Sequence, residues 1–441
     1  MTNAPQGHDP RAEQSEARRP AEPVAVRDEP QALRGTSSAR PWNGRPRPST
    51  PQEWLERAAD VAGILAADAV ERDRAQAVPT AEVQLLKDAG LVTLLGPVEH
   101  GGAGQTWETA YRVIREVASG DGSIGQLLGY HYLWAWAVRL VGTPDQIAAV
   151  EELYTTQNFF FGGAVNPRDN DLTITEDGDE LVYNGRKSFS TGSKVSDLTV
   201  LEGVLEGTEK HIFAIVPSHQ DGIVFHDDWD NLGQRLTESG GVTITDVRIP
   251  WAAAAGYVDK DPVELTYGTL NLPAIQLVFA NFYLGIAQGG LKAATAYTRK
   301  TTRAWPYGGD DKEHAHEEWY ILEGYGRLQS QVWAAEALAD AAGAEISELL
   351  HAEREALTPE QRGHAAVRIA AVKQLTTDAA LEVGTKIFEL TGARATSNAV
   401  GLDIFWRNAR THTLHDPVAY KRREVGEFAL LGTLPEPTWY T

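Results

Sequence analysis

The 441-residue sequence contains no cysteine, and its only methionine is the first residue. A disulfide, a thiolate metal site and a catalytic thiol are therefore excluded. Because Cys and Met are the side chains that an oxidant damages first, drift or a preference for oxidation-resistant residues accounts for the composition. A sharper hypothesis is that the protein is made when sulfur is scarce.

Positive charge is also scarce, since 40 Lys and Arg stand against 61 Asp and Glu, for a formal net charge of -21. Nucleic acids and anionic membranes are held by clustered Lys and Arg, so we expect neither as a partner and expect a small molecule instead. No uninterrupted apolar run approaches the 18 residues that span a bilayer, and the N-terminus has no signal-peptide core. These features predict a cytoplasmic protein.

A polar stretch precedes the first sign of regular structure. Residues 1–49 are rich in Pro, Arg, Glu, Ala and Ser and predict a disordered tail. Thr50-Pro51-Gln52-Glu53 is a capping box with proline at the first helical position, and it predicts the start of a helical domain over residues 50–157. A second signal of the same kind, Thr143-Pro144-Asp145-Gln146, predicts another helix within it.

The remaining chain divides into strands and then helices. Over residues 158–262, short alternating runs such as HIFAIV and GVTITDVRI predict a central β domain of barrel-like or sandwich form. Residues 263–441 predict a C-terminal four-helix bundle, whose clearest helix begins at Thr358 and ends at Gly392. Strands and helices do not alternate, which excludes a doubly wound nucleotide-binding sheet and predicts an α+β fold.

Two motifs suggest a ligand but have simpler explanations. HGGAGQTW at residues 100–107 lacks the GxGxxG spacing of a phosphate cradle, so we interpret it as a loop whose glycines adopt positive φ. His314 and His316 form one histidine pair, and His412 and His415 form another, but a metal site needs three or four ligands. No metal site is predicted.

The position of the second pair raises a different question. His412 and His415 lie three residues apart just before Pro417, where a helical run must stop. Imidazole can donate or accept a proton near neutral pH, which suits a catalytic role. The plain alternative is a capped helix end in which the imidazoles satisfy the final carbonyls.

Several motifs follow one another in an order that resembles the acyl-CoA dehydrogenase superfamily. They are the GGAG loop, NGRKSFSTG at residues 184–192, LGQRLTESG followed by VRIP, and FELTGAR at residues 388–394. The resemblance covers residues 51–441. It implies an acyl-CoA dehydrogenase-like fold, a flavin bound between the β domain and the C-terminal bundle, and a homotetramer.

Within the superfamily, the C-terminal motif indicates the chemistry. Dehydrogenase members commonly carry a glutamate base where this sequence reads THTLHDP at residues 411–417. With GYH at 129–131, QLVFANFYLGIAQG at 276–289 and WRNARTHTLHDPVAYK at 406–421, the chain resembles the dibenzothiophene monooxygenase type of flavin-dependent monooxygenase. These enzymes use FMN as FMNH2, which makes FAD the less favoured flavin, and they receive it from a separate NAD(P)H:flavin reductase.

The resemblance implies how the reaction proceeds. Reduced flavin and O2 give a C4a-hydroperoxide, which oxygenates a small hydrophobic substrate, here an organosulfur or heteroaromatic compound of the dibenzothiophene type. His131 and His415 would flank the reacting oxygen, with His412 close by. Thr191, where relatives have serine, would hydrogen-bond near the flavin N5 and O4 edge.

The same resemblance assigns the flavin contacts. Phe189 would border the isoalloxazine, and Arg303 would bind the flavin phosphate. Arg394 would reach in from a neighbouring subunit. A guanidinium matches phosphate geometry, although an interface or surface ion pair is an equally simple explanation for either arginine.

The predicted substrate pocket departs from the family pattern. Gly163 stands where the sulfur-oxidising relatives have an asparagine. Trp134 and Trp136 would reshape or narrow a pocket lined by Phe279 and Phe282, unless these aromatic residues belong to the core. We therefore expect the oxygenating machinery to be kept and the substrate to differ.

Three other functions stay open at this point. The first is an N- or C-hydroxylase of the same fold acting on an amine or a natural-product scaffold. The second is an acyl-CoA dehydrogenase whose base lies elsewhere. The third is a protein of this fold that only binds a ligand or a partner.

Overall fold

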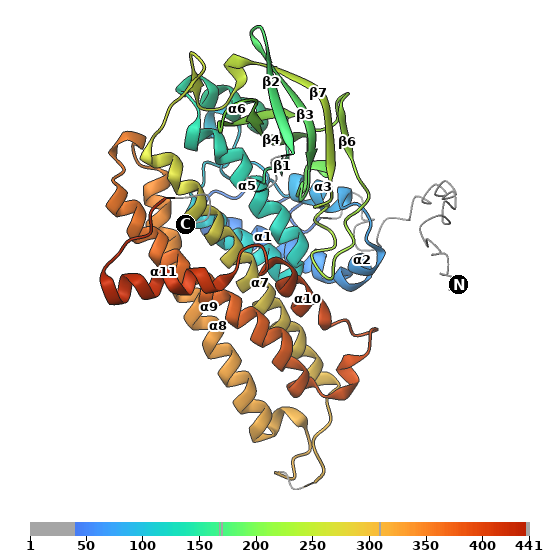
Figure 1. Ribbon diagram of the computed structural model, residues 1–441. Helices are drawn as coiled ribbons and strands as arrows, with labels where there is room; N and C mark the ends of the chain where they lie inside the picture. The colour runs from blue at the N-terminus through green and yellow to red at the C-terminus, as the bar shows by residue number, and fades with distance from the viewer. Residues whose placement is uncertain (1–39, 167, 169–170, 308–309, 438–441) are drawn as a thin grey trace, which may run out of the picture.

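The computed structural model describes residues 40–166, 168, 171–307 and 310–437. Figure 1 shows the β sheet at one end of the molecule, N-terminal helices across the middle and long C-terminal helices reaching to the other end. The order of helices, strands and helices confirms the predicted α+β architecture. One large apolar core joins the two helical regions, and a second, smaller core lies within the sheet.

The N-terminal helices begin where the sequence predicts. Thr50 accepts a hydrogen bond from the N–H of Glu53, and Thr143 accepts one from the N–H of Gln146, so each helix start satisfies a backbone donor that it would otherwise leave free. The helices of this region are α1 (Pro51–Ala66), α2 (Ala69–Ala75), α3 (Thr80–Asp88), α4 (Trp107–Gly120), α5 (Gly122–Val141) and α6 (Pro144–Gln157).

Part of the predicted tail is folded. Residues 1–39 lie outside the described residues, but the expectation of disorder is wrong for residues 40–49. Trp42 is buried, with the Arg57 guanidinium 5.2 Å from its ring centre, and Arg45 binds Asp60 at 2.9 Å. A single aromatic anchor in a polar stretch leaves no periodic signal, so composition alone could not detect it.

The HGGAGQTW segment is a loop between the short 3-10 helix η2 (Val98–His100) and α4, as predicted. Gly101 and Gly104 have φ values of 86° and 58°, which an L side chain rarely adopts. A Cβ at Gly102 would lie 2.1 Å from the carbonyl oxygen of Gly96, so the glycine there permits close backbone packing.

Helix α5 passes through the centre of the molecule. Seventeen of its 20 residues are buried, and the carboxylate of its N-cap, Asp121, accepts hydrogen bonds from the N–H groups of Ser123 and Ile124. A helix buried on nearly every face has no solvent side for polar groups. The polar side chains of α5 therefore need partners inside the protein or in a ligand.

The β domain is one curled sheet with its own core, in line with the predicted barrel-like form. The strand order is β1-β4-β2-β3-β7-β6, with β5 also paired to β4. β4 pairs in parallel with β1 and β2, and the other pairs are antiparallel. The strands are β1 (Phe161–Ala164), β2 (Leu172–Asp177), β3 (Glu180–Lys187), β4 (Leu198–Leu205), β5 (His211–Pro217), β6 (Ile223–Phe225) and β7 (Val242–Pro250), and the short pair β8 (Tyr257–Val258) and β9 (Asp261–Pro262) stands apart.

The C-terminal helices form the predicted bundle. The long helices α7, α8 and α9 pack on one another, and α11 packs against α9 as a shorter fourth helix. α9 begins after Thr358 and ends before Gly392, as predicted, and at 1.5 Å per residue its 33 residues span roughly 50 Å. The helices are α7 (Asn271–Lys300), α8 (Trp319–Leu350), α9 (Pro359–Thr391), α10 (Asp403–His412) and α11 (Val418–Leu431).

One helical stretch is longer and more apolar than expected. Over Thr266–Lys300, a window of mean hydropathy 1.4 is long and apolar enough to cross a bilayer, and 83% of it is buried inside the protein. No uninterrupted apolar run of that length lies within the helix, because polar residues such as Asn281 and Gln276 interrupt the apolar ones.

Candidate active site

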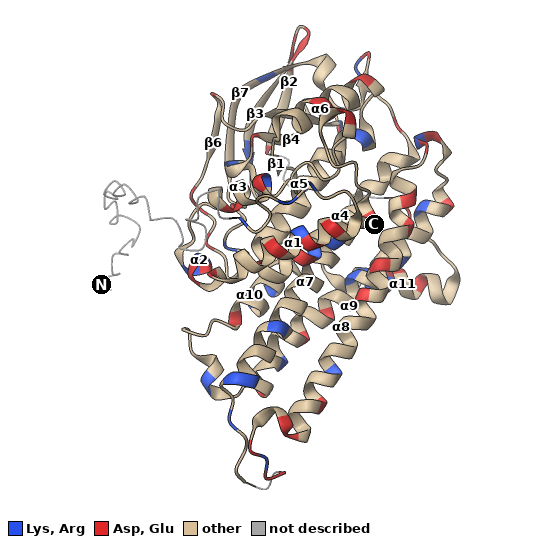
Figure 2. Ribbon diagram, turned by 180° about the vertical axis from the view of Figure 1, so that it is seen from behind, with Lys and Arg blue, Asp and Glu red and all other residues tan. Residues whose placement is uncertain are grey.

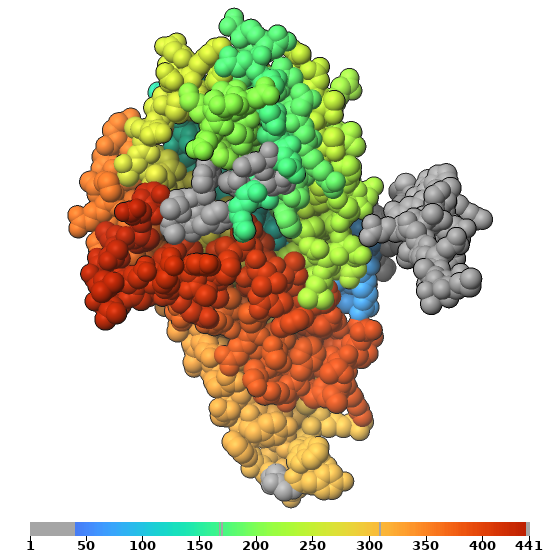
Figure 3. Space-filling model, in the orientation of Figure 1, coloured from blue at the N-terminus to red at the C-terminus, as the bar shows by residue number. Residues whose placement is uncertain are grey.

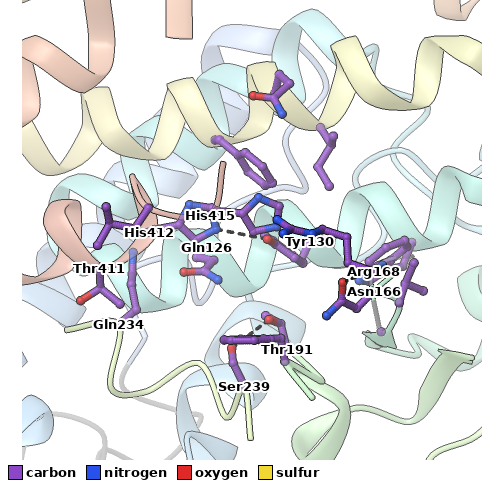
Figure 4. A pocket seen from close by; sticks show the side chains of 18 of the residues that line it. Gln126, Tyr130, Asn166, Arg168, Thr191, Gln234, Ser239, Thr411, His412 and His415 are labelled. Carbon is purple, nitrogen blue, oxygen red and sulfur yellow. Dashed lines mark hydrogen bonds between the residues drawn. The ribbon is translucent and has the colours of Figure 1, made fainter. Parts of the chain in front are cut away.

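The candidate site is a cavity of about 470 Å³ between the β domain and the helices α5 and α7 (Figure 4). The segment that links α10 to α11 closes it from the C-terminal side, and Figure 3 shows these C-terminal residues (red) packed below the β domain (green). The polar or aromatic residues of its lining are Gln126, Tyr130, Trp134, Asn166, Arg168, Phe189, Thr191, Phe213, Trp229, Asn231, Gln234, Ser239, Asn271, Gln276, Phe279, Thr411, His412 and His415.

One face of α5 forms a wall of this cavity. Gln126, Tyr130 and Trp134 follow one another at intervals of four residues, which places them on the same side of the helix. The Oε1 atom of Gln126 has no hydrogen-bond partner among the described residues. The Tyr130 ring stacks on Phe279 of α7, with ring centres 5.7 Å apart, so the two helices meet at the cavity.

His412, the last residue of α10, is buried between two tyrosines. Its Nδ1 lies 2.8 Å from the hydroxyl of Tyr283, and its Nε2 lies 3.1 Å from the hydroxyl of Tyr130. Burial lowers the pKa of His412 well below its usual value, and the nearby His415 and Lys373 lower it further. His412 is therefore neutral near pH 7. Burial also raises the pKa of both tyrosines, which stay protonated.

His415 is the more accessible imidazole, with 42% of its side chain exposed. Its ring lies parallel to that of His412, with ring centres 5.4 Å apart, and its Nδ1 lies 3.2 Å from Oδ1 of Asp416. The backbone N–H of His415 donates to the carbonyl of His412, which fixes the turn after α10. As predicted, helix α10 ends before Pro417.

A buried ion pair lies behind His415. Lys373 of α9 donates to Asp416, and both residues are buried. Burial alone would raise the pKa of Asp416, but the hydrogen bond from His415 and the charge of Lys373 outweigh burial and lower it far below the usual range. Burial lowers the pKa of Lys373 to about 8, against the opposing effect of Asp416.

The β-domain side of the cavity offers hydroxyl groups and an exposed ring. The Oγ1 of Thr191 lies 2.8 Å from the Oγ of Ser239, which in turn lies 2.8 Å from the Oγ1 of Thr237. Phe189 has a φ of 60° and is 60% exposed, and its ring meets Trp229 edge-on at 6.2 Å. Figure 4 shows Thr191 and Ser239 facing Tyr130 and His415 across the cavity.

Gly163 and Trp134 occupy one corner of the cavity together. A Cβ built on Gly163 would lie 2.4 Å from both Nε1 and Cε2 of the Trp134 indole, far below any real carbon contact. The structure therefore brings these two predicted pocket residues into direct contact. Phe279 also lines the cavity, whereas Phe282 is fully buried behind His412, with ring centres 4.7 Å apart.

The structure does not bring His131 to the cavity. Its Nε2 lies 2.7 Å from the carbonyl oxygen of Val92, and its Nδ1 accepts a hydrogen bond from the N–H of Phe161. The ring is fully buried and stacks on Phe160 at 4.7 Å. Because both ring nitrogens are occupied, His131 links α5 to the first strand, and this placement does not support the predicted position beside the reacting oxygen.

Arg303 and Arg394 also lie away from the cavity of their own chain. Arg303 follows the end of α7, and the 21 residues from Phe279 to Lys300 place it roughly 30 Å along the helix from the cavity. Arg394 lies at the same distal end, where Thr302 donates to the carbonyl of Thr391. Both arginines are exposed.

The sequence motifs missed several residues that shape the cavity. Tyr130 stands directly before the predicted His131, and Ser239 lies in the quoted LGQRLTESG motif, so both belong to segments that the sequence had already marked. Tyr283 also lies in a quoted motif, QLVFANFYLGIAQG, but nothing local in the sequence pairs it with His412 or pairs Lys373 with Asp416, because these partners are distant in sequence. The described residues contain no group of three or more potential metal ligands.

The cavity fits a flat heteroaromatic ring with several polar atoms. The side-chain amide of Gln234 and the Oε1 of Gln126 are buried without a protein partner in the described part of the chain, and both residues line the cavity. The cavity also offers hydroxyl groups and the exposed phenyl ring of Phe189. Phe189, Thr191, Gln126 and Gln234 would hold such a ring.

Comparison with known families agrees with this geometry. Residues 52–150 match the N-terminal domain of acyl-CoA dehydrogenases, and residues 277–419 match their C-terminal domain. The fold and the cavity therefore define a flavoprotein of the acyl-CoA dehydrogenase superfamily.

Individual relatives narrow the class. Dibenzothiophene monooxygenase of Rhodococcus erythropolis is 39% identical, over 89% of this chain and 97% of its own. A probable FMNH2-dependent monooxygenase, SfnC of Pseudomonas putida, is 36% identical over 91% of this chain and 99% of its own. The crystal structure of TdsC of Paenibacillus sp. A11-2 with FMN and indole covers 88% of this chain and all of its own, at 36% identity and a TM-score of 0.83.

The chain belongs to the flavin-dependent monooxygenases of this superfamily, alongside dibenzothiophene monooxygenase.

Proposed function

We propose that the protein is the oxygenase of a two-component system that uses reduced FMN and O2 to oxygenate the sulfur of a hydrophobic organosulfur or heteroaromatic compound. The FMN dependence follows from the relatives, one of which was solved with FMN bound. Reduced FMN, when bound, supplies the activated oxygen atom. The protein binds the substrate, excludes water and controls protons.

One observation carries this proposal. No Asp or Glu is among the described residues that line the cavity, whereas two imidazoles are. A dehydrogenase needs a carboxylate to remove an α-proton, and the carboxylate beside His415, that of Asp416, is bound to Lys373. The arrangement therefore disfavours an acyl-CoA dehydrogenase and suits an oxygenase.

Each polar residue of the cavity then has a role in the proposal. His415, with Nδ1 directed to Asp416, holds or moves a proton at its Nε2 atom. His412 supports Tyr130 through its Nε2. Thr191 hydrogen-bonds the polar edge of the flavin, Phe189 borders its ring, and Trp134, Gly163 and Phe279 enclose the substrate.

The proposed partners are a separate NAD(P)H:flavin reductase and three further copies of the chain. The single curled sheet is not a doubly wound nucleotide-binding sheet, so an external source of reduced flavin suits it. Exposed Trp319, Leu322 and Trp333 on α8 provide apolar surface for a subunit contact. In such a tetramer, Arg303 and Arg394 bind the flavin phosphate of a neighbouring subunit.

The remaining surface agrees with a small-molecule substrate. Acidic residues are interspersed with Lys and Arg along the helices in the view from behind (Figure 2). With the formal net charge of -21, this pattern gives no extended basic face for nucleic acid on the side shown. We place the enzyme in the cytoplasm, where a reductase and NAD(P)H are at hand.

The test is a single-turnover reaction with isotopic oxygen. Purified protein is mixed with chemically reduced FMN, dibenzothiophene and ¹⁸O2, and the products are analysed by mass spectrometry. One ¹⁸O atom in the sulfoxide supports the proposal. Labelled product from an amine or carbon skeleton but none from any sulfide would move the assignment to an N- or C-hydroxylase. Reduction of bound flavin by an acyl-CoA would overturn it.

A further inference from the structure

The two tyrosines around His412 can be assigned donor and acceptor roles. The Tyr283 hydroxyl lies 2.8 Å from Nδ1 of His412 and 3.1 Å from the carbonyl oxygen of the same residue. A carbonyl oxygen only accepts, so the single proton of Tyr283 goes to it. The Tyr283 oxygen then accepts from Nδ1–H. This is the one assignment that gives both contacts a donor and an acceptor.

The assignment extends to the cavity. His412 is neutral, so it carries one N–H, and that N–H is on Nδ1. Its Nε2 is therefore a lone pair, 3.1 Å from the hydroxyl of Tyr130. The Tyr130 O–H must donate to it. The dashed line from His412 to Tyr130 in Figure 4 marks this bond at the cavity wall.

We propose that Tyr283 is a positioning residue that fixes the tautomer of His412 and thereby makes the Tyr130 oxygen a hydrogen-bond acceptor toward the cavity. Tyr283 itself is fully buried and does not line the cavity, so it acts only through His412. This inference rests on the proposed function, which places the substrate among Trp134, Gly163 and Phe279, and the Tyr130 ring lies beside both Trp134 and Phe279.

The consequence is a preference among ligands of one shape. A tricyclic compound with an N–H group can donate a hydrogen bond to the Tyr130 oxygen. A compound that offers only a lone pair at this place forms no hydrogen bond, because the tyrosine oxygen is itself an acceptor. Carbazole and dibenzofuran have nearly the same outline as dibenzothiophene and differ in this respect. We expect the protein to bind carbazole ~10-fold more tightly than dibenzofuran, the ordinary value of one buried hydrogen bond.

Tyr283→Phe should reverse the arrangement. Without the phenol, an N–H on Nδ1 of His412 would be a buried donor with no acceptor. This costs more free energy than leaving an Nδ1 lone pair without a donor. The proton moves to Nε2 and is donated to Tyr130, whose own O–H turns to the cavity. The carbazole preference should then vanish or invert. In Tyr130→Phe, which has no hydroxyl at all, the two ligands should bind within about twofold of each other.

The tautomer itself is measured by ¹⁵N NMR of histidine-labelled protein, with the His412 signals identified by their loss in His412→Gln. The wild type should carry the proton on Nδ1 and Tyr283→Phe should carry it on Nε2. A wild-type proton on Nε2 overturns the inference, and so does a tautomer that Tyr283→Phe leaves unchanged. The tautomer is read in the wild-type protein and only the assignment of its signals uses a variant, so a Tyr283→Phe protein that misfolds cannot protect the inference.

Binding is measured at equilibrium, by carbazole fluorescence and by competition with dibenzofuran, without turnover. An equal carbazole preference in the wild type, Tyr283→Phe and Tyr130→Phe would also overturn the inference. Because no reaction is involved, this outcome is separable from the oxygenation test. If no ¹⁸O enters the product but the wild type still prefers carbazole to dibenzofuran, only the proposed function is contradicted. If ¹⁸O enters the product but the carbazole preference is the same in all three proteins, only the role of Tyr283 is contradicted.

Discussion

Nδ1 of His415 lies 3.2 Å from the carboxylate of Asp416, and the same oxygen of that carboxylate accepts a hydrogen bond from Lys373. The buried ion pair thus supports the one imidazole that is both in the cavity and exposed. Because Asp416 accepts at Nδ1, the Nε2 atom of His415 is left for the cavity.

Breaking the buried pair should destabilise the protein strongly. Asp416→Asn and Lys373→Met each leave one uncompensated group in the interior, at a cost of about 3–5 kcal/mol. The double variant removes both charges and should be more stable than either single variant. Thermal unfolding of the four proteins checks this. Additive losses in the double variant would show that the two residues do not act as a pair.

His415→Ala should keep the fold and FMN binding and lose product. Without the imidazole, proton control near the reacting oxygen fails, so the yield of oxygenated product should fall ~100-fold while hydrogen peroxide rises to account for the reduced FMN consumed. His314→Ala, at an exposed loop histidine, is the matched control and should behave as the wild type. An unchanged product yield in His415→Ala would remove the catalytic role proposed for it.

Gly163→Ala should disturb the cavity through Trp134. The new methyl group would fall 2.4 Å from the indole, so the side chain or the strand must move, at a cost of about 1–3 kcal/mol. Trp134→Phe removes the indole atoms that clash, and the double variant should recover most of the lost stability. Melting temperatures of the two single variants and the double variant test the coupling. A Gly163→Ala protein as stable as the wild type contradicts the predicted clash.

The buried His131 should make stability depend on pH. Burial lowers the pKa of His131 from 6.5 to about 4. Between these pH values, the imidazole is protonated in the unfolded chain and neutral in the folded protein. The contribution of neutral His131 to the free energy of unfolding is therefore complete above pH 6.5 and is lost as the pH falls toward 4. The loss is on the order of 3 kcal/mol.

Unfolding in denaturant across this pH range measures the effect. His131→Asn should be less stable than the wild type at pH 7, because two buried hydrogen bonds lose their geometry, and its stability should fall less steeply toward pH 4. His314→Asn serves as the exposed control and should retain the wild-type slope. Parallel curves for His131→Asn and the wild type would assign the pH dependence to other groups.

Much of the fold was predictable because its signals are local. The capping boxes at Thr50, Thr143 and Thr358 place three helix starts, and the change from helical spacing to alternating residues marks the β domain. His412, His415, Phe189 and Thr191 were found through motifs whose order resembles a family. All four line the cavity.

Other features depend on long-range contacts or on the orientation of a buried helix. In GYH, the sequence could not show that Tyr130 faces the cavity and His131 faces Val92, because α5 is buried on nearly every face and its few polar residues do not mark a solvent side. The usual amphipathic pattern that orients a helix is missing there. Lys373 meets Asp416, and Tyr283 meets His412, only after the bundle has formed.

The shared corner of Gly163 and Trp134 couples the choice of side chain at these two positions. Two bulky groups cannot fill one volume, so a side chain at 163 and an indole at 134 exclude each other unless one of them moves. A protein with glycine at 163 and a small residue at 134 would leave this corner open and have a larger cavity. The size of the pair therefore sets an upper limit on the molecules that the cavity can admit.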